Sequence, residues 1–243
     1  MNAIRAIICD VYRTILDVGE APQDAEERWI KLCRGALGRD SGLSLEQLAA
    51  RCGDIISEDH REARERGILY PEVHWPAVMN RALPGLETLP HADLDAFLFD
   101  HAQLFRTLRM NPGCATVLRE CRERGLLLGI ASNAQAYTLR ELDLALREAG
   151  LDASIFQSDL TFWSFEHGFS KPNPHVFQIL RARLQAHGVS QSETLMIGDR
   201  EDNDIAPART AGWRTWLFPD PRNHAGNGDW DSLGRVLFES AEQ

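Results

Sequence analysis

The sequence predicts an α/β fold in which a parallel sheet is interrupted, soon after its first strand, by a smaller all-helical domain. Two observations predict this fold. Short apolar runs alternate with helical stretches near the two ends of the chain, which is the order of a parallel sheet with crossover helices. The segment between them shows helical periodicity and no convincing buried strand. We therefore expect a discontinuous core, residues 1–17 and 107–243, and a helical domain, residues 18–106.

The strands of the predicted sheet are short and almost continuously apolar, as strands buried on both faces are. The first covers residues 4–10, is rich in isoleucine and ends on the carboxylate of Asp10. Runs of the same kind follow at residues 126–132, 194–199 and 213–218. Helical spacing between them is clearest at residues 113–124 and 174–186.

The inserted segment has the pattern of several amphipathic helices. They are predicted at residues 22–36, 44–66, 76–82 and 91–109. Because the insertion follows the first strand directly, we expect these helices to lie over the carboxyl edge of the sheet. That edge is where ligands bind in open α/β sheets.

Composition limits the classes of partner. The chain has 243 residues, of which 44% are hydrophobic, and a formal net charge of -10. Such an acidic chain would repel nucleic-acid phosphates and anionic membranes, so we expect a small-molecule substrate, no nucleic acid and no membrane. The oligomeric state is left open.

Two further features indicate a cytoplasmic protein. The first ten residues contain too short an apolar stretch for a signal peptide, and no run approaches the roughly 20 apolar residues that span a bilayer. The five cysteines are odd in number and form no C-x-x-C pair, so we expect reduced thiols in the core.

Four polar clusters fall at strand ends or just beyond them. They are Asp10 with Tyr12 and Thr14, Ser132 with Asn133, Lys171, and Asp199 with Asp202 and Asp204. Parallel strands end at one edge, so these side chains are expected to converge. Carboxylates that meet repel unless a pKa rises or a cation lies between them, and Mg²⁺ is the natural candidate. With a lysine and a hydroxyl–amide pair, such a site suits a phosphoryl group.

Four segments, in order and spacing, resemble the motifs of the haloacid dehalogenase superfamily. They are DVYRTILD, ASN, SKPNP and IGDREDNDIAPARTAGW. The resemblance covers residues 4–17 and 110–218, and four ordered motifs are far more specific than one. It implies a hydrolase with a Rossmann-like core, in which the inserted helical segment is the cap.

The resemblance also implies roles for the matching residues. Asp10 would be the nucleophile that forms a covalent intermediate, and Lys171 would neutralise charge on the transferring group. The residues that would bind this group are Thr14, Ser132 and Asn133. The Mg²⁺ ligands would be Asp10, Asp199 and the backbone carbonyl of residue 12, with Asp204 in support. The chain has only two lysines, so a lysine in SKPNP suggests that a point charge is needed there.

Tyr12 departs from the phosphatases of this superfamily, which carry an aspartate there to protonate the leaving group and activate water. Loss of a general acid typically lowers the rate by about 10² to 10⁴. A tyrosine resembles the metal-free 2-haloacid dehalogenases, yet those lack the acidic signature of Gly198, Asp199 and Asp204. Tyr12 is kept as a catalytic candidate because it lies so close to Asp10.

Arg13 departs from both groups, because the superfamily has glycine there. It is a candidate to hold a substrate carboxylate or phosphate in bidentate fashion, or it points into solvent. In the helical domain, the candidates for substrate specificity are Arg61, Arg64, Tyr70, His74 and Trp75. A solvated helix face with a packed aromatic pair is the favoured explanation of these residues.

Three functions compete. The favoured one is Mg²⁺-dependent hydrolysis of a small phosphorylated metabolite through an aspartyl intermediate, with a preference for good leaving groups such as acyl or aryl phosphates. The second is a 2-haloacid dehalogenase, whose activity chelation would not affect. The third is a catalytically silent homologue that binds a phospho-ligand without turning it over.

Overall fold

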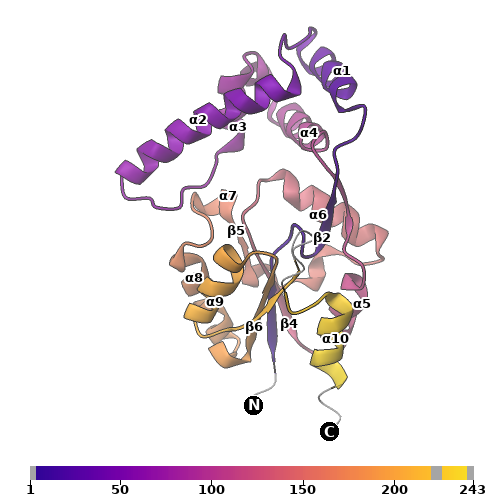
Figure 1. Cartoon of the computed structure of the whole chain (residues 1–243), viewed down its shortest axis with the longest axis vertical. Coiled ribbons are helices and arrows are strands. Elements are labelled where there is room, and N and C mark those ends of the chain that lie inside the picture. The colour runs from indigo at the N-terminus through magenta and orange to yellow at the C-terminus, as the bar shows by residue number, and fades with distance from the viewer. Residues whose placement is uncertain (1–3, 220–225, 240–243) are drawn as a thin grey trace.

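The computed structural model describes residues 4–219 and 226–239. Figure 1 shows the course of the chain. Its strands are β1 (Ala6–Cys9), β2 (Leu16–Gly19), β3 (Thr107–Met110), β4 (Leu127–Ser132), β5 (Thr161–Trp163), β6 (Thr194–Gly198) and β7 (Arg214–Leu217). Its α-helices are α1 (Ala25–Leu37), α2 (Leu45–Glu65), α3 (Trp75–Ala82), α4 (His91–Ala102), α5 (Cys114–Glu123), α6 (Tyr137–Glu148), α7 (Ser164–His167), α8 (Pro174–Ala186), α9 (Ala206–Thr210) and α10 (Trp230–Phe238). The shorter helical turns are η1 (Leu86–Thr88), η2 (Ala153–Ile155), η3 (Ser158–Leu160), η4 (Gln191–Glu193) and the π-helical turn η5 (Glu201–Ile205).

The main sheet has five parallel strands in the order β5-β4-β1-β6-β7. From the central β1 the chain builds outward through β4 to β5, and then returns to the other side of β1 for β6 and β7. The strand order therefore reverses beside β1, and ligands bind at the carboxyl end of such a reversal. The predicted α/β class and all four predicted strands are confirmed.

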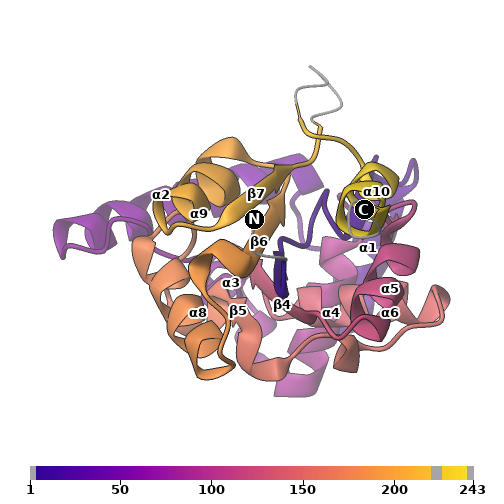
Figure 2. The ribbon, with the colours of Figure 1, turned by 90° about the horizontal axis from the view of Figure 1, so that it is seen from below.

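Helices cover both faces of this sheet. Figure 2 shows α8 and α9 on one side of the strands and α5, α6 and α10 on the other. Strand β1 explains the arrangement, because its residues alternate between the two layers. Ile7 and Cys9 belong to the cluster beneath α5, α6 and α10, whereas Ala6 and Ile8 belong to the cluster beneath α8 and α9. All four are buried, as the apolar sequence predicts.

The inserted segment is helical, as predicted, and lies beyond the carboxyl ends of the strands (Figure 1). Helices α1 to α4 share a hydrophobic cluster of their own, which includes Trp29, Leu48, Met79 and Phe97. Helix α2 begins with a capping box in which Ser44 and Gln47 satisfy each other's backbone N–H groups. The division of the chain into domains at residues 17/18 and 106/107 stays a prediction.

The chain enters and leaves the helical segment through one antiparallel ribbon. Strand β2 leads out and β3 leads back, with Leu16 opposite Met110 and Gly19 opposite Thr107. Neither strand was predicted. The helix predicted at residues 91–109 is wrong beyond Ala102, where α4 ends and the chain becomes extended. The backbone of residues 107–110 is paired with a strand far earlier in the chain, and local periodicity does not report such a pairing.

Two features expected from composition can be compared with the structure. All five cysteines are buried and free of disulfides. Across residues 4–219 and 226–239, no helix combines the length and the apolar character needed to cross a membrane.

Candidate active site

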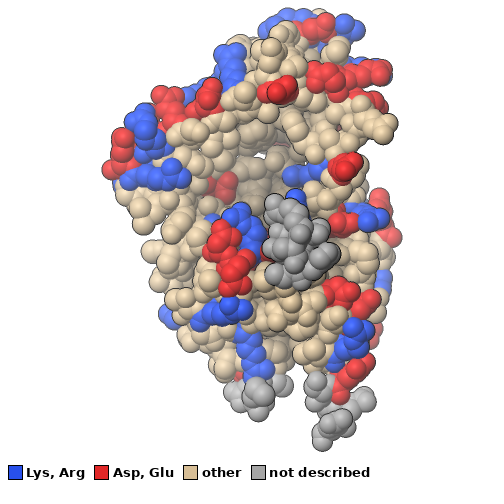
Figure 3. All heavy atoms as spheres, in the orientation of Figure 1, with Lys and Arg blue, Asp and Glu red and all other residues tan. Residues whose placement is uncertain are grey.

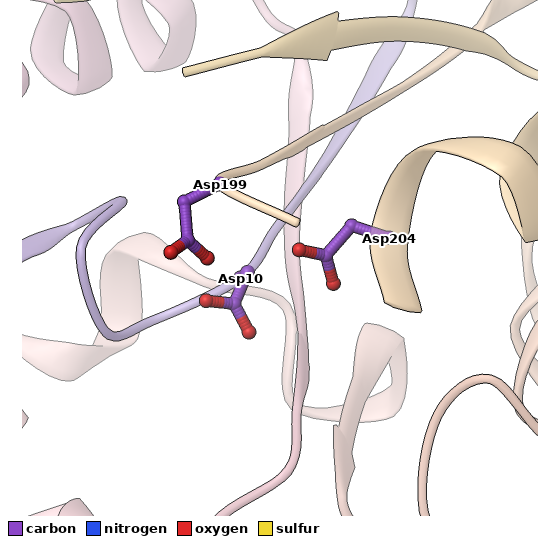
Figure 4. Close-up of side chains that lie close together, drawn as sticks. All are labelled: Asp10, Asp199 and Asp204. Carbon is purple, nitrogen blue, oxygen red and sulfur yellow. The ribbon is translucent and has the colours of Figure 1, made fainter. Parts of the chain in front are cut away.

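Three carboxylates converge at the carboxyl edge of the main sheet. Asp10 follows β1, Asp199 follows the neighbouring β6, and Asp204 lies in η5. One carboxylate oxygen from each lies within 4.8 Å of the others, and Figure 4 shows the three groups facing a common space. Adjacent parallel strands bring the first two together, as the sequence predicts.

Lys171 lies between two of these carboxylates. Its Nζ donates to Oδ1 of Asp10 at 2.7 Å and to Oδ1 of Asp204 at 2.5 Å, and its side chain is only 2% exposed. Asn133 holds the lysine in place: its Nδ2 donates to the Lys171 carbonyl at 2.9 Å, and its Oδ1 accepts from the Lys171 N–H at 2.7 Å. The Asn133 amide is therefore engaged with the backbone of Lys171, and its side chain also lines the hollow beside the carboxylates.

Gly198 explains how Asp204 approaches the strand end. A Cβ at this glycine would overlap the carboxylate of Asp204, so another residue here would displace that group. The backbone N–H of Arg200 donates to Oδ2 of Asp204 at 3.1 Å. Asp202, from the same segment, points elsewhere and pairs with the Arg200 guanidinium.

The ionisation of these groups follows from their burial and crowding. Burial raises the pKa of Asp10 to about 7; Asp204 and Asp199 push it the same way, and Lys171 opposes them. Burial and Asp204 also raise the pKa of Asp199. Burial alone would lower the pKa of Lys171, but Asp10 and Asp204 outweigh it and raise the pKa. Lys171 is thus bonded to two of the three acids, and the oxygens of all three suit a hard divalent cation such as Mg²⁺.

The Tyr12 hydroxyl is occupied. It donates to Oε2 of Glu141 at 2.5 Å, accepts from Nη2 of Arg106 at 2.9 Å and lies 2.6 Å from Oγ1 of Thr138. Burial also raises the pKa of Tyr12. The hydroxyl proton is therefore directed toward helix α6 and is not available to a leaving group.

Of the remaining predicted residues, one is exposed and two are buried. Arg13 is exposed beside the carboxylates and adopts a left-handed backbone with φ 60°, a region that glycine enters more easily. Thr14 and Ser132 are fully buried, and their hydroxyls have no hydrogen-bond partner among the described residues. An unpaired buried hydroxyl calls for an explanation, and a ligand is one.

Two hollows lie in this region, and Figure 3 shows the surface hollowed between the helical segment and the sheet-containing part. The smaller, of about 200 Å³, is lined by Asp10, Tyr12, Arg13, Asn133, Lys171, Asp199, Arg200, Asn203 and Asp204. The larger, of about 550 Å³, lies between the helical segment and the core; the residues at its wall include His74, Trp75, Phe99, Tyr137, Arg140 and Phe165. His74 and Trp75 were among the five specificity candidates.

Sequence reasoning missed the residues around Tyr12. They are Gln103, Arg106, Thr138 and Glu141. One signal was present: Glu141 falls at helical spacing with Thr138 and Ala145, on the face of α6 that is buried. A carboxylate on an apolar helix face needs a partner, although the sequence does not identify which.

Comparisons with known proteins identify the family. The family model of haloacid dehalogenase-like hydrolases matches residues 4–212. A glyceraldehyde 3-phosphate phosphatase from Methanopyrus kandleri is 27% identical over 212 residues, covering 87% of this chain and 82% of the relative.

Two solved structures are similar in fold. A 2-haloacid dehalogenase from Pseudomonas syringae pv. Tomato has a TM-score of 0.62 at 20% identity, covering 98% of this chain and 99% of that chain. A haloacid dehalogenase family enzyme from Bacteroides thetaiotaomicron, in complex with magnesium and inorganic phosphate, has a TM-score of 0.58 at 16% identity, covering 95% of this chain and 99% of that chain. At these identities the two structures show similarity of fold alone.

Proposed function

The chain belongs to the haloacid dehalogenase-like hydrolases, and on that basis we propose that it is a Mg²⁺-dependent phosphatase of a small phosphorylated metabolite. The observation that carries the proposal is the convergence of Asp10, Asp199 and Asp204 around a single buried lysine. A divalent cation would make use of all three carboxylates, whereas attack on carbon in a metal-free dehalogenase requires only the nucleophile. A relative over most of the chain is named a glyceraldehyde 3-phosphate phosphatase, which also favours a small phosphate ester.

In the proposed reaction, a carboxylate oxygen of Asp10 attacks phosphorus and the leaving group departs with its electron pair. Water then attacks the phosphoaspartate, which releases phosphate and restores the carboxylate. Lys171 offsets negative charge on the phosphoryl oxygens, and the unpaired hydroxyls of Thr14 and Ser132 are the proposed donors to them. Mg²⁺, held by Asp10 and Asp199 with support from Asp204, would supply further positive charge.

The surroundings of Tyr12 define the leaving groups that the proposed enzyme should prefer. The Tyr12 hydroxyl is bonded to Glu141, so Tyr12 does not replace the aspartate of the phosphatases as a proton donor. The enzyme should therefore prefer leaving groups that need no proton, such as acyl and aryl phosphates.

We also propose that residues 18–106 act as a cap over the core formed by residues 1–17 and 107–243. A cytoplasmic location remains an expectation from composition.

A dehalogenase is the second candidate, because Tyr12 follows the pattern of those enzymes and Arg13 is exposed in the hollow. Arg13 would hold the substrate carboxylate while Asp10 attacks carbon. A binding protein without turnover is the third, since Tyr12 and Arg13 both depart from the phosphatases.

One set of assays separates the three. Phosphate release from acetyl phosphate and p-nitrophenyl phosphate is measured with Mg²⁺ and with chelator, and chloride release from 2-chloropropionate is measured in parallel. Asp10→Asn should lower phosphate release by at least about 10³-fold, and chelation should abolish it. Asp202→Asn is the matched control. Asp202 is an exposed aspartate of η5, the turn that also carries Asp204, and the variant should retain activity.

Other outcomes contradict the proposal. Chloride release that resists chelation, without phosphate release, would identify a dehalogenase. Ligand binding without product from any of these substrates would favour the silent homologue.

A further inference from the structure

Glu141 is a buried carboxylate that joins three segments distant in sequence. Only 1% of its side chain is exposed. Its Oε2 accepts from the Tyr12 hydroxyl at 2.5 Å, and its Oε1 accepts from Nε2 of Gln103 at 2.7 Å. Nη2 of Arg106 lies within hydrogen-bond distance of both oxygens, at 2.9 and 3.0 Å. All of these donors lie outside helix α6, to which Glu141 belongs.

The donors come from the two places where the chain passes between the sheet and the helical segment. Tyr12 precedes β2 on the outward passage, and Gln103 and Arg106 lie between α4 and β3 on the return passage. The Arg106 guanidinium also stacks over the Tyr12 ring, 4.4 Å from its centroid. One carboxylate of the core thus fixes both passages and the loop that follows Asp10.

That loop is short and tightly bonded, so its parts cannot move independently. The N–H of Arg13 donates to the Leu16 carbonyl at 2.6 Å, and the N–H of Leu16 donates to the Val11 carbonyl at 2.8 Å. Tyr12 lies inside this turn, two residues after Asp10. A displaced Tyr12 side chain therefore moves the backbone that aims the Asp10 carboxylate.

We propose that Glu141 is a positioning residue for the reaction. Through Tyr12 it holds the loop that carries Asp10, and through Gln103 and Arg106 it makes the geometry of that loop depend on the position of the helical segment. Its kinetic consequence rests on the proposed phosphatase function, whereas its structural consequence does not.

The kinetic test compares Glu141→Gln, Tyr12→Phe and the double variant on p-nitrophenyl phosphate. Glu141→Gln keeps the shape of the side chain but replaces one carboxylate oxygen, which accepts hydrogen bonds, with an amide N–H₂, which donates them. We expect kcat to fall about tenfold to a hundredfold with KM changed less than about threefold, because Asp10 is misaligned while Lys171 still binds phosphate. The double variant should be no worse than the more impaired single variant. Effects that multiply would show that Glu141 does not act through Tyr12, and would overturn the proposal.

Asp17→Asn is the matched control. Asp17 on β2 pairs with Arg109 on β3, so it also joins the two passages, but the pair is exposed and does not touch Tyr12. Its kcat should equal that of the parent. An equal loss in Asp17→Asn and Glu141→Gln would mean that any link between the passages matters, which contradicts a specific role for Glu141.

Hydrogen exchange provides a readout that needs no activity. The amides of Leu16 and Asn111 donate to the carbonyls of Val11 and Ile15, and both should exchange faster in Glu141→Gln than in the parent. Amides of β6 should be unchanged. If the parent hydrolyses none of the phosphate esters, the proposed function fails but this measurement still tests the positioning role; unaltered exchange overturns it. If Glu141→Gln does not fold, Tyr12→Phe carries both measurements.

Discussion

Lys171 is the residue on which the electrostatics of the site depend. It is buried between Asp10 and Asp204, and the two ion pairs are short. Lys171→Met would leave two buried carboxylates without their cation, which lowers the free energy of unfolding by about 3 to 5 kcal/mol. Urea denaturation in the presence of chelator measures this loss.

Lys31→Met is the matched control, since Lys31 is the only other lysine of the chain and its side chain is exposed. It should leave the free energy of unfolding nearly unchanged. A loss below about 1 kcal/mol in Lys171→Met would contradict the prediction, because the carboxylates would then be satisfied without the lysine.

In the proposed reaction, Tyr12 determines which of the two steps is slow. Its hydroxyl is bonded to Glu141, so no group at this position activates water against the phosphoaspartate. With p-nitrophenyl phosphate, whose leaving group needs no proton, we expect a burst of nitrophenolate about equal to the enzyme concentration, followed by slower turnover. Stopped-flow absorbance measures the burst. Linear release from the first turnover onward would contradict a slow second step.

Residues near strand ends could be predicted, and residues around Tyr12 could not. Asp10 and Asp199 come together because parallel strands end at one edge, and the short apolar runs of the sequence locate those ends. The partners of Tyr12 lie on a passage and a helix far away in the chain, and nothing local to Tyr12 reports them. The orientation of its hydroxyl, and with it the loss of a proton donor, needed the structure.

Among the elements, helix α4 shows how the helical segment maintains its own core. His101 lies within this helix among Trp29, Phe97 and Phe105, and its Nε2 has no hydrogen-bond partner among the described residues. Burial lowers the pKa of His101 from 6.5 to about 4. The core therefore favours the neutral imidazole.

This burial predicts a pH dependence of stability. Between pH 6.5 and 4 the unfolded chain protonates His101 while the folded chain does not, so the free energy of unfolding falls as the pH drops through this range. The contribution is up to about 3 kcal/mol and is complete above pH 6.5. Urea denaturation across this range should show a flatter profile for His101→Phe than for the parent. His91→Gln, an exposed position of the same helix, should keep the parent's profile, and a His101→Phe profile that matches the parent's would refute the assignment.

The elements that sequence analysis missed share one property. Strands β2, β3 and β5 have three or four residues each, and unlike the equally short β1 none of them is a continuous run of apolar residues. Helix α8, by contrast, was predicted at its observed bounds, because a proline opens it and its apolar residues repeat over three turns. Helices of several turns can be predicted from the sequence, whereas short strands that pair with distant segments cannot.

At the scale of the whole molecule, folding brings together negative charges that are far apart in the unfolded chain. The net charge is -10, and three carboxylates meet at one edge of the sheet. An ion that binds this site and not the unfolded chain stabilises the fold, by about 2.7 kcal/mol at a hundred times its Kd. For a chain of this size that raises Tm by about 5 to 10 °C.

Calorimetry with Mg²⁺ measures this shift. Asp199→Asn should lose most of it, whereas Asp202→Asn should retain it. Equal shifts in the parent and in Asp199→Asn would show that the ion binds the acidic surface elsewhere.

The ribbon of β2 and β3 makes the helical segment an exchangeable cassette. Gly19 and Thr107 face each other where the segment departs, and the missing side chain of Gly19 leaves room for the Thr107 hydroxyl. The two ends of the cassette therefore meet, and a segment of another length can be spliced between them while the sheet keeps its register. The entropy of closing such a loop changes only slowly with its length. A graft at this ribbon would thus replace the helical segment together with Gln103 and Arg106, the partners of Glu141, while the three carboxylates and their lysine stay unchanged in sequence.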